Sequence, residues 1–207
     1  MVWKKLICLL LLSSAASWAA SISWTGSFVG DNEMFLVSFT LPTGGDVTIQ
    51  TWGYGGGVNA AGVTIPAGGF APALALFESW DPQNLAGLDA LGGTAPNDCT
   101  PIGLRNPDNG SCLDALIQVT LAPGSYFFTL TQQGNTPSDG TFGDGFTGNG
   151  SFLDPISGNE RTKNWAVDLV GPDDMQTGVP EPAAALPLAL ALMAGFWRVR
   201  RRSRVGV

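Results

Sequence analysis

The sequence predicts an all-β protein built as a single β-sandwich domain of the jelly-roll kind, and two observations support this class. Segments with alternating apolar and polar residues recur along the chain, and no segment before residue 180 keeps a helical apolar period. The chain also holds 28 Gly and 14 Pro, which favour tight turns between short strands. We therefore expect about seven or eight strands, joined by wide loops, in two packed sheets.

The expected strands are separated by clear turn signals. They span residues 22–30, 34–41, 47–52, 73–77, 114–121, 125–132 and 164–170. Ala122-Pro123-Gly124 separates two of these segments by a tight turn, which predicts a β-hairpin. The intervening segments 53–72, 78–113 and 133–163 are rich in glycine or in turn-forming residues and are expected to form wide loops.

The first 19 residues have the pattern of a secretory signal peptide. Lys4 and Lys5 precede an apolar run over residues 6–12, and small residues at Ser17 and Ala19 suit cleavage by signal peptidase after Ala19. The β-sandwich domain is therefore expected to span residues 20–171, followed by a short polar linker over residues 172–178.

The last part of the chain combines three features in order. Val179-Pro180-Glu181-Pro182 precedes an uncharged segment, 183–197, and the tail 198–204 is basic through Arg198, Arg200, Arg201, Arg202 and Arg204. As a helix the uncharged segment would reach only about 22 Å, so flanking arginines would extend into the headgroups of a bilayer core of roughly 30 Å. Positive charge at this end favours a cytoplasmic C-terminus. A plain C-terminal anchor is the alternative interpretation.

These three features resemble the PEP-CTERM sorting signal of Gram-negative bacteria. The resemblance implies processing by an exosortase after transient anchoring in the inner membrane. It also implies delivery to the cell surface or to an extracellular matrix, in association with exopolysaccharide or biofilm.

A second resemblance covers about residues 22–171. It rests on Thr51-Trp52-Gly53-Tyr54, on residues 65–70 and 121–126, and on Asn164-Trp165-Ala166-Val167-Asp168. These segments are similar to an uncharacterised DVUA-type family of exported PEP-CTERM proteins. That family implies a β-sandwich like the pre-peptidase C-terminal domain and no particular chemistry.

Charge is distributed very unevenly. All seventeen Asp and Glu lie between residues 31 and 181, where only Arg105, Arg161 and Lys163 are basic, which leaves a net charge of −14 for that part. Such acidity argues against nucleic acid or anionic lipid as a partner. It suits divalent cations or neutral glycans, and it equally suits simple solubility.

Two cysteines remain after removal of the signal peptide, Cys99 and Cys112. In an exported protein we expect them to form a disulfide, which would close a ring of about fourteen residues and add on the order of 3 kcal/mol. Titration of two free thiols in the unreduced protein would contradict this pairing.

Catalysis is not expected. The chain has no histidine, which removes the Ser-His-Asp and Cys-His arrangements, and it has no nucleophile elbow. Paired carboxylates of the glycosidase type stay open, with Asp114 and Asp168 as candidates on strands.

Calcium is the candidate cofactor, because loops dense in carboxylate and amide oxygens supply the ligands that it prefers. Ordinary turn chemistry explains the same residues equally well. The candidate ligands form three groups along the chain: Asp31, Asn32 and Glu33; Asp98, Asp108, Asn109 and Asp114; and Asp139, Asp144 and Asn149.

Aromatic residues at the ends of strands suggest a third hypothesis. Trp52 and Tyr54 are expected to be surface rings that stack on sugars, whereas Trp24 and Trp165 are expected in the core. The sequence as a whole therefore predicts an exported, non-enzymatic structural or adhesive protein. The alternatives are a Ca²⁺-dependent carbohydrate-binding module and, less favoured, a glycan-active enzyme.

Overall fold

The computed structural model describes residues 19–78, 90–92, 105–138 and 142–178, and of residues 90–92 it describes the backbone alone. Within these ranges the chain forms strands and no helix. The strands are β1 (Ala20–Ser27), β2 (Phe35–Leu41), β3 (Gly45–Thr51), β4 (Gly57–Val58), β5 (Thr64–Ile65), β6 (Pro72–Glu78), β7 (Ala90–Gly92), β8 (Leu116–Leu121), β9 (Gly124–Gln132), β10 (Asn164–Gly171) and β11 (Gln176–Thr177).

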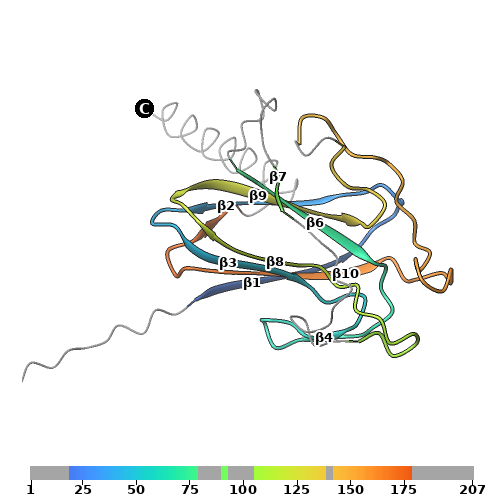
Figure 1. The fold of residues 1–207 in the computed structure, drawn as a ribbon. Helices are drawn as coiled ribbons and strands as arrows, with labels where there is room; N and C mark the ends of the chain where they lie inside the picture. The colour runs from blue at the N-terminus through green and yellow to red at the C-terminus, as the bar shows by residue number, and fades with distance from the viewer. Residues whose placement is uncertain (1–18, 79–89, 93–104, 139–141, 179–207) are drawn as a thin grey trace, which may run out of the picture.

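Two antiparallel sheets lie face to face (Figure 1). One has the strand order β1-β10-β3-β8, the other has the order β11-β2-β9-β6-β7, and β4 with β5 forms a separate two-stranded ribbon. This arrangement confirms the predicted all-β class and is that of a two-sheet β-sandwich.

The main core lies between the two sheets, on the faces that the alternating pattern predicted. Phe39 and Leu41 of β2 and Phe128 and Leu130 of β9 contribute from one sheet, and Ile49, Val167 and Leu169 are among the residues from the other. Trp24 and Trp165 are partly buried and pack against this core, as expected. Each fully buried aliphatic or aromatic side chain contributes roughly 1.5–3 kcal/mol, so this core is the main source of stability.

The predicted hairpin between residues 114–121 and 125–132 is wrong. β8 belongs to the β1 sheet and pairs with β3, whereas β9 belongs to the other sheet and pairs with β2 and β6. Ala122-Pro123 therefore carries the chain from one sheet to the other. A tight turn is compatible with a hairpin and with a crossing between sheets. The crossing is adopted because it lets the apolar faces of β8 and β9 pack against each other in the core.

The predicted linker over residues 172–178 also needs correction. Gln176 and Thr177 form β11, which pairs with Thr40 and Phe39 of β2 at the edge of the second sheet. Met175 is only 8% exposed and belongs to the main core. The domain therefore extends to Thr177 instead of ending at Gly171.

A second apolar cluster covers the outer face of the β2-β9-β6 sheet. Phe77 and Phe127 stack with ring centroids 4.8 Å apart, and Phe142 packs edge-on against Phe127 at 4.9 Å. Phe146 extends the cluster. The segment around residues 142–146 thus buries two outward-facing phenylalanines that alternation alone would place in solvent.

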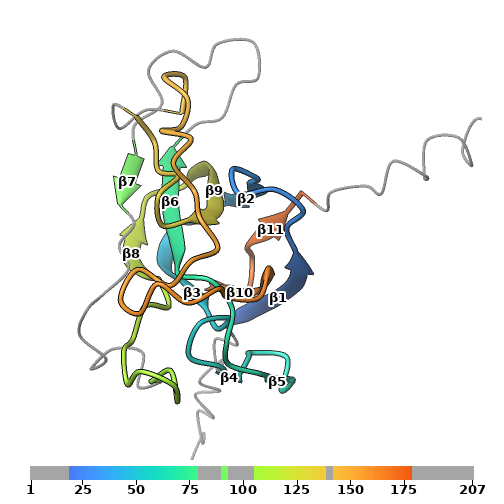
Figure 2. The same cartoon turned by 90° about the vertical axis from the view of Figure 1, so that its right-hand side faces the viewer.

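The long loops gather at one end of the sandwich. The loops 28–34 and 52–71, the segments 133–138 and 142–163, and the segment that leads into β8 all lie there, because the strands that they join begin or end at this end (Figure 1). Figure 2 views this end directly, with the β4–β5 ribbon below the sheets. We call it the loop end.

Replacing the buried Met175 tests whether residues after Gly171 belong to the domain. Met175→Ala should lower the free energy of unfolding by about 2 kcal/mol or more, because it removes core contacts and leaves a cavity. The exposed neighbour Gln176→Ala should change it by less than about 0.5 kcal/mol. Equal effects of the two variants in denaturant unfolding would restore the linker interpretation.

Candidate functional site: the loop end and its groove

A buried ion pair connects the loops at this end. Arg161 donates from Nε to Asp154 Oδ2 at 2.8 Å and from Nη1 to Asp108 Oδ2 at 3.0 Å. The side chains of Arg161 and Asp154 are 6% and 0% exposed. The guanidinium also lies over the ring of Tyr54, at 5.1 Å from the centroid. Three separate loop segments, around residues 54, 108 and 154–161, therefore meet at one guanidinium.

Neutral donors complete the shell around Asp154. The Tyr54 hydroxyl donates to Oδ2 at 2.8 Å, and the Asn109 amide donates to the same oxygen and to the Tyr54 hydroxyl oxygen. Burial by itself would raise the pKa of Asp154. Hydrogen bonds from Ser157 N, Tyr54 and Arg161 outweigh burial and hold that pKa well below its usual range. Asp154 is therefore a structural anion at neutral pH.

A second buried carboxylate holds the turn that follows β3. Asp114 accepts hydrogen bonds from Thr51 Oγ1 at 3.0 Å, Tyr54 N at 3.1 Å and Gly55 N at 2.6 Å. Burial raises the pKa of Asp114, and these hydrogen bonds only partly offset the effect. The side chain of Asp114 thus orders the backbone of residues 54 and 55.

A third carboxylate, Asp168 on β10, attaches the β4–β5 region to the outer face of the first sheet. Its Oδ2 accepts from Trp52 Nε1 at 2.6 Å and from Ala60 N at 2.7 Å. Its Oδ1 is buried and has no hydrogen-bond partner within the described ranges. Asp114 and Asp168 therefore bind different parts of the same loop, and their predicted role as paired carboxylates stays a prediction.

Several of the predicted calcium ligands form hydrogen bonds within the protein. Glu33 accepts from Val29 N at 2.7 Å, Asn32 Oδ1 accepts from Gly150 N at 2.9 Å, and Asp31 lies in the same turn. Asp108 and Asn109 contact Arg161 and Asp154, whereas Asp114 contacts the turn after β3. Asp144 is exposed, and Asp98 and Asp139 lie outside the described residues. Among the residues that the structure describes, no three Asp, Glu, Cys or His side chains gather at one place that could hold a metal.

The prediction of Tyr54 as a surface ring is wrong. The residue is 0% exposed, because its hydroxyl is needed by Asp154 and its ring lies beneath Arg161. Trp52 is partly buried, and its indole N–H is already donated to Asp168. Tyr54 is therefore not presented for stacking, whereas the prediction for Trp52 stays a prediction.

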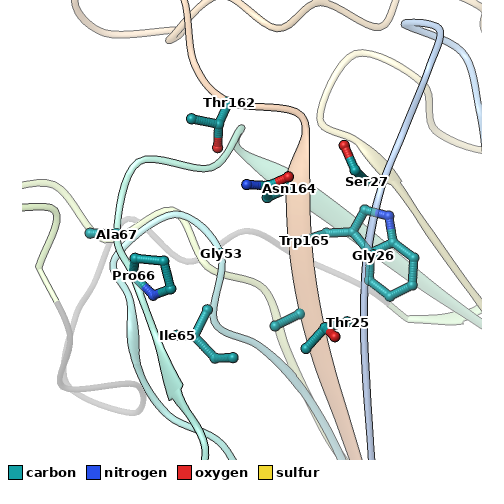
Figure 3. Close-up of a pocket in the computed structure, with 11 residues that line it drawn as sticks. Thr25, Gly26, Ser27, Gly53, Ile65, Pro66, Ala67, Thr162, Asn164 and Trp165 are labelled. Atoms are coloured by element: carbon teal, nitrogen blue, oxygen red, sulfur yellow. The ribbon is translucent and has the colours of Figure 1, made fainter.

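A groove opens beside this network, between the outer face of β1–β10 and the loop that follows β5. Its volume is about 630 Å³. Thr25 and Ser27 line it from β1, Asn164 from β10 and Thr162 from just before β10, while Ile65 lines it from the end of β5 and Pro66 from the loop that follows (Figure 3). No charged side chain is among the described residues that line it. The groove is thus neutral although the surrounding domain is strongly acidic.

Sequence reasoning missed this groove and the role of Arg161. One signal could have found the arginine, because it is one of only three basic residues between residues 20 and 178. A lone cation among many carboxylates is a reasonable candidate for a buried pair. The groove had no such signal, because it is lined by uncharged residues from distant segments.

Several sequence predictions fall where the structure describes nothing. The signal peptide 1–19, apart from Ala19, and the sorting signal 179–204 lie outside the described residues. Cys112 is 2% exposed and does not carry a free thiol. Its predicted partner Cys99 lies outside the described part, so that pairing stays a prediction. A search of the described residues for a helix long and apolar enough to cross a membrane found none.

No known protein-family model matches the chain, and a search of curated proteins found no match.

Replacing Arg161 by the uncharged Met tests the buried pair. Arg161→Met should lower the free energy of unfolding by about 3–5 kcal/mol, because it leaves Asp154 charged and buried without its cation. Adding Asp154→Asn should recover part of this loss by removing that charge. The exposed Arg105→Met should cost less than about 1 kcal/mol, because within the described part of the chain its side chain bonds only Gly110 O. A loss no larger for Arg161→Met than for Arg105→Met in denaturant unfolding would contradict this account.

Proposed function

We propose that this chain is an exported, non-enzymatic binding module of the cell envelope or extracellular matrix that retains extracellular polysaccharide at its loop end. The architecture that we infer is a jelly roll. In support, β1-β10-β3-β8 faces β2-β9-β6-β7, and the chain crosses repeatedly between the two sheets. Sandwiches of this connectivity present loops at the ends of their sheets, where ligands commonly bind.

The single observation that carries this proposal is the preorganised loop end. Arg161, Asp114 and Asp168 tie loop segments that are distant in sequence to one another and to the sheets. A surface ordered in advance loses less conformational entropy when it binds a ligand. The groove lies within this ordered region, so its shape is available before any ligand arrives.

The geometry favours binding over catalysis. Acid–base chemistry needs ionisable groups within reach of a bound substrate. The groove presents hydroxyls and an amide, while Asp154 and Asp114 are buried and engaged by several donors each. We therefore assign the loop end to recognition without turnover.

We further propose the route by which the module reaches its location. Cleavage after Ala19 would release the domain from the secretion machinery. The segment 179–204 would then hold it briefly in the inner membrane, with the C-terminus in the cytoplasm, until an exosortase acts at Pro180-Glu181-Pro182. The resemblance of these residues to a PEP-CTERM signal supports this route.

Fractionation of a Gram-negative host that carries an exosortase tests the route. The tagged full-length protein should be recovered at the cell surface or in the matrix. A Glu181→Ala/Pro182→Ala variant should accumulate in the inner membrane, and a variant of the exposed Glu160, Glu160→Ala, should match the wild type. Identical distributions of all three proteins would overturn sorting by this motif.

Retention on the host's own exopolysaccharide tests the binding role. We expect the full-length protein to be retained equally with millimolar calcium and with chelator, because Asp114 and Asp154 accept hydrogen bonds from protein donors and no three acidic side chains of the described residues gather at one place. Retention that requires calcium would instead favour the Ca²⁺-dependent carbohydrate-binding module. No retention in either condition would overturn the polysaccharide role and leave a purely structural protein.

A further inference from the structure

The groove between β1–β10 and the 65–67 loop holds hydrogen-bonding side chains that the protein itself does not use. Thr25, Ser27, Thr162 and Asn164 are exposed, and among the described residues none of their side-chain atoms takes part in a hydrogen bond. By contrast, several acidic and amide side chains elsewhere at the loop end form hydrogen bonds within the protein. Asn32, Asn106, Asn109, Asp114 and Asp154 all bond neighbouring loops.

Three of the four free side chains converge because strand pairing places them together, and Thr162 lies just before the start of β10. Ser27 on β1 is the cross-strand partner of Asn164 on β10, and Thr25 is the partner of Ala166. Thr25, Ser27, Asn164 and Ala166 all lie on the outer face of the sheet. The residues that alternate with them, such as Trp24 and Val167, face the core. Figure 3 shows Ile65 and Pro66 on the opposite wall.

The opposite wall is held in place by backbone hydrogen bonds. Gly69 N donates to Gly53 O at 2.8 Å, and Thr162 N donates to Gly68 O at 2.9 Å. The backbone approaches so closely that a Cβ at Gly69 would lie 2.7 Å from the carbonyl oxygens of both Asn164 and Gly53. The groove is therefore a fixed feature of the fold and not a gap that the loop can close at little cost.

The chemistry of the walls selects a neutral, hydroxyl-rich ligand. Hydroxyl and amide groups on the sheet side can donate to and accept from hydroxyls, and Ile65 with Pro66 offers apolar surface to C–H faces. An anionic ligand would be repelled by the acidic domain, and a cationic one would find no carboxylate in the described lining. The volume of about 630 Å³ is within the roughly 300–1,000 Å³ of small-ligand sites.

We infer that this groove binds a segment of an uncharged polysaccharide, with Thr25, Ser27, Thr162 and Asn164 bonding its hydroxyls and Ile65 and Pro66 contacting the sugar rings. This inference rests on the proposed polysaccharide role and adds the site and the ligand class. Binding of this kind requires no metal ion and is insensitive to salt, because no charge is paired.

Calorimetry on the full-length protein in mild detergent tests the site with defined probes. The probes are neutral gluco-, manno- and galacto-oligosaccharides, an anionic oligogalacturonate and an apolar uncharged peptide. We expect at least one neutral oligosaccharide to bind, with an affinity unchanged between low and high salt. Thr25→Ala/Asn164→Ala should weaken that binding by about tenfold or more, since two hydrogen bonds are lost. Ser27→Trp should abolish it by filling the groove.

Matched controls separate the groove from the rest of the surface. Ser21→Ala on β1 and Thr64→Ala on β5 replace exposed hydroxyls outside the groove and should leave affinity unchanged. Equal melting temperatures of all variants would show that they are folded, and these exposed sites make that the expected result.

The outcomes distinguish this inference from the proposed function. Retention on whole exopolysaccharide that is untouched by the groove variants would overturn the groove and leave the polysaccharide role intact. Binding of oligogalacturonate or of the peptide in place of the neutral sugars would overturn the ligand class. Absence of binding to every oligosaccharide and to whole exopolysaccharide would overturn both proposals.

Discussion

The buried contact between Arg161 and Asp154 is the interaction on which the loop end depends. It joins the segment before β10 to the segments around Tyr54 and Asp108. These segments are connected by side-chain contacts and not by strand pairing. A buried ion pair is favourable only when its remaining polar atoms are satisfied, and here Tyr54, Asn109 and backbone N–H groups surround Asp154. The arrangement therefore depends on each member, because loss of Arg161 would leave Asp154 charged and buried without its cation. It converts long glycine-rich loops into an ordered surface.

Two other buried carboxylates, closer to the groove, also order loop segments by accepting hydrogen bonds from them. Asp114 orders the turn after β3, and Asp168 attaches Ala60 and Trp52 to the outer face of the sheet. Asp114, which the sequence suggested as a calcium ligand, and Asp168, which it suggested as one of a pair of catalytic carboxylates, thus both have structural roles. Asp114, Asp154 and Asp168 therefore accept hydrogen bonds that hold the loops. The side chains that remain available in the groove, such as Thr25, Ser27 and Asn164, are uncharged. This separation of buried carboxylates from uncharged groove residues explains how a strongly acidic domain can offer an uncharged binding surface.

Prediction from sequence succeeded where local pattern and burial agree. The alternation in residues 34–41 and 164–170 identified β2 and β10 together with the faces that they bury, because a strand with one covered face must alternate. It failed for the partner of β8, since a tight turn after Leu121 serves a hairpin and a crossing between sheets equally well. It also failed for Tyr54, whose ring is buried by a cation more than one hundred residues further along the chain.

The sequence by itself determined the all-β class, the core-facing residues of most strands and the concentration of negative charge between residues 31 and 181. These properties depend on local periodicity and composition, which are fully contained in the order of residues. Only the tertiary structure decided that β11 joins the second sheet, that Arg161 finds Asp154 and that Thr25, Ser27 and Asn164 meet in one groove. Those outcomes depend on which distant segments become neighbours, and contacts of that range are set by the packing of the whole domain.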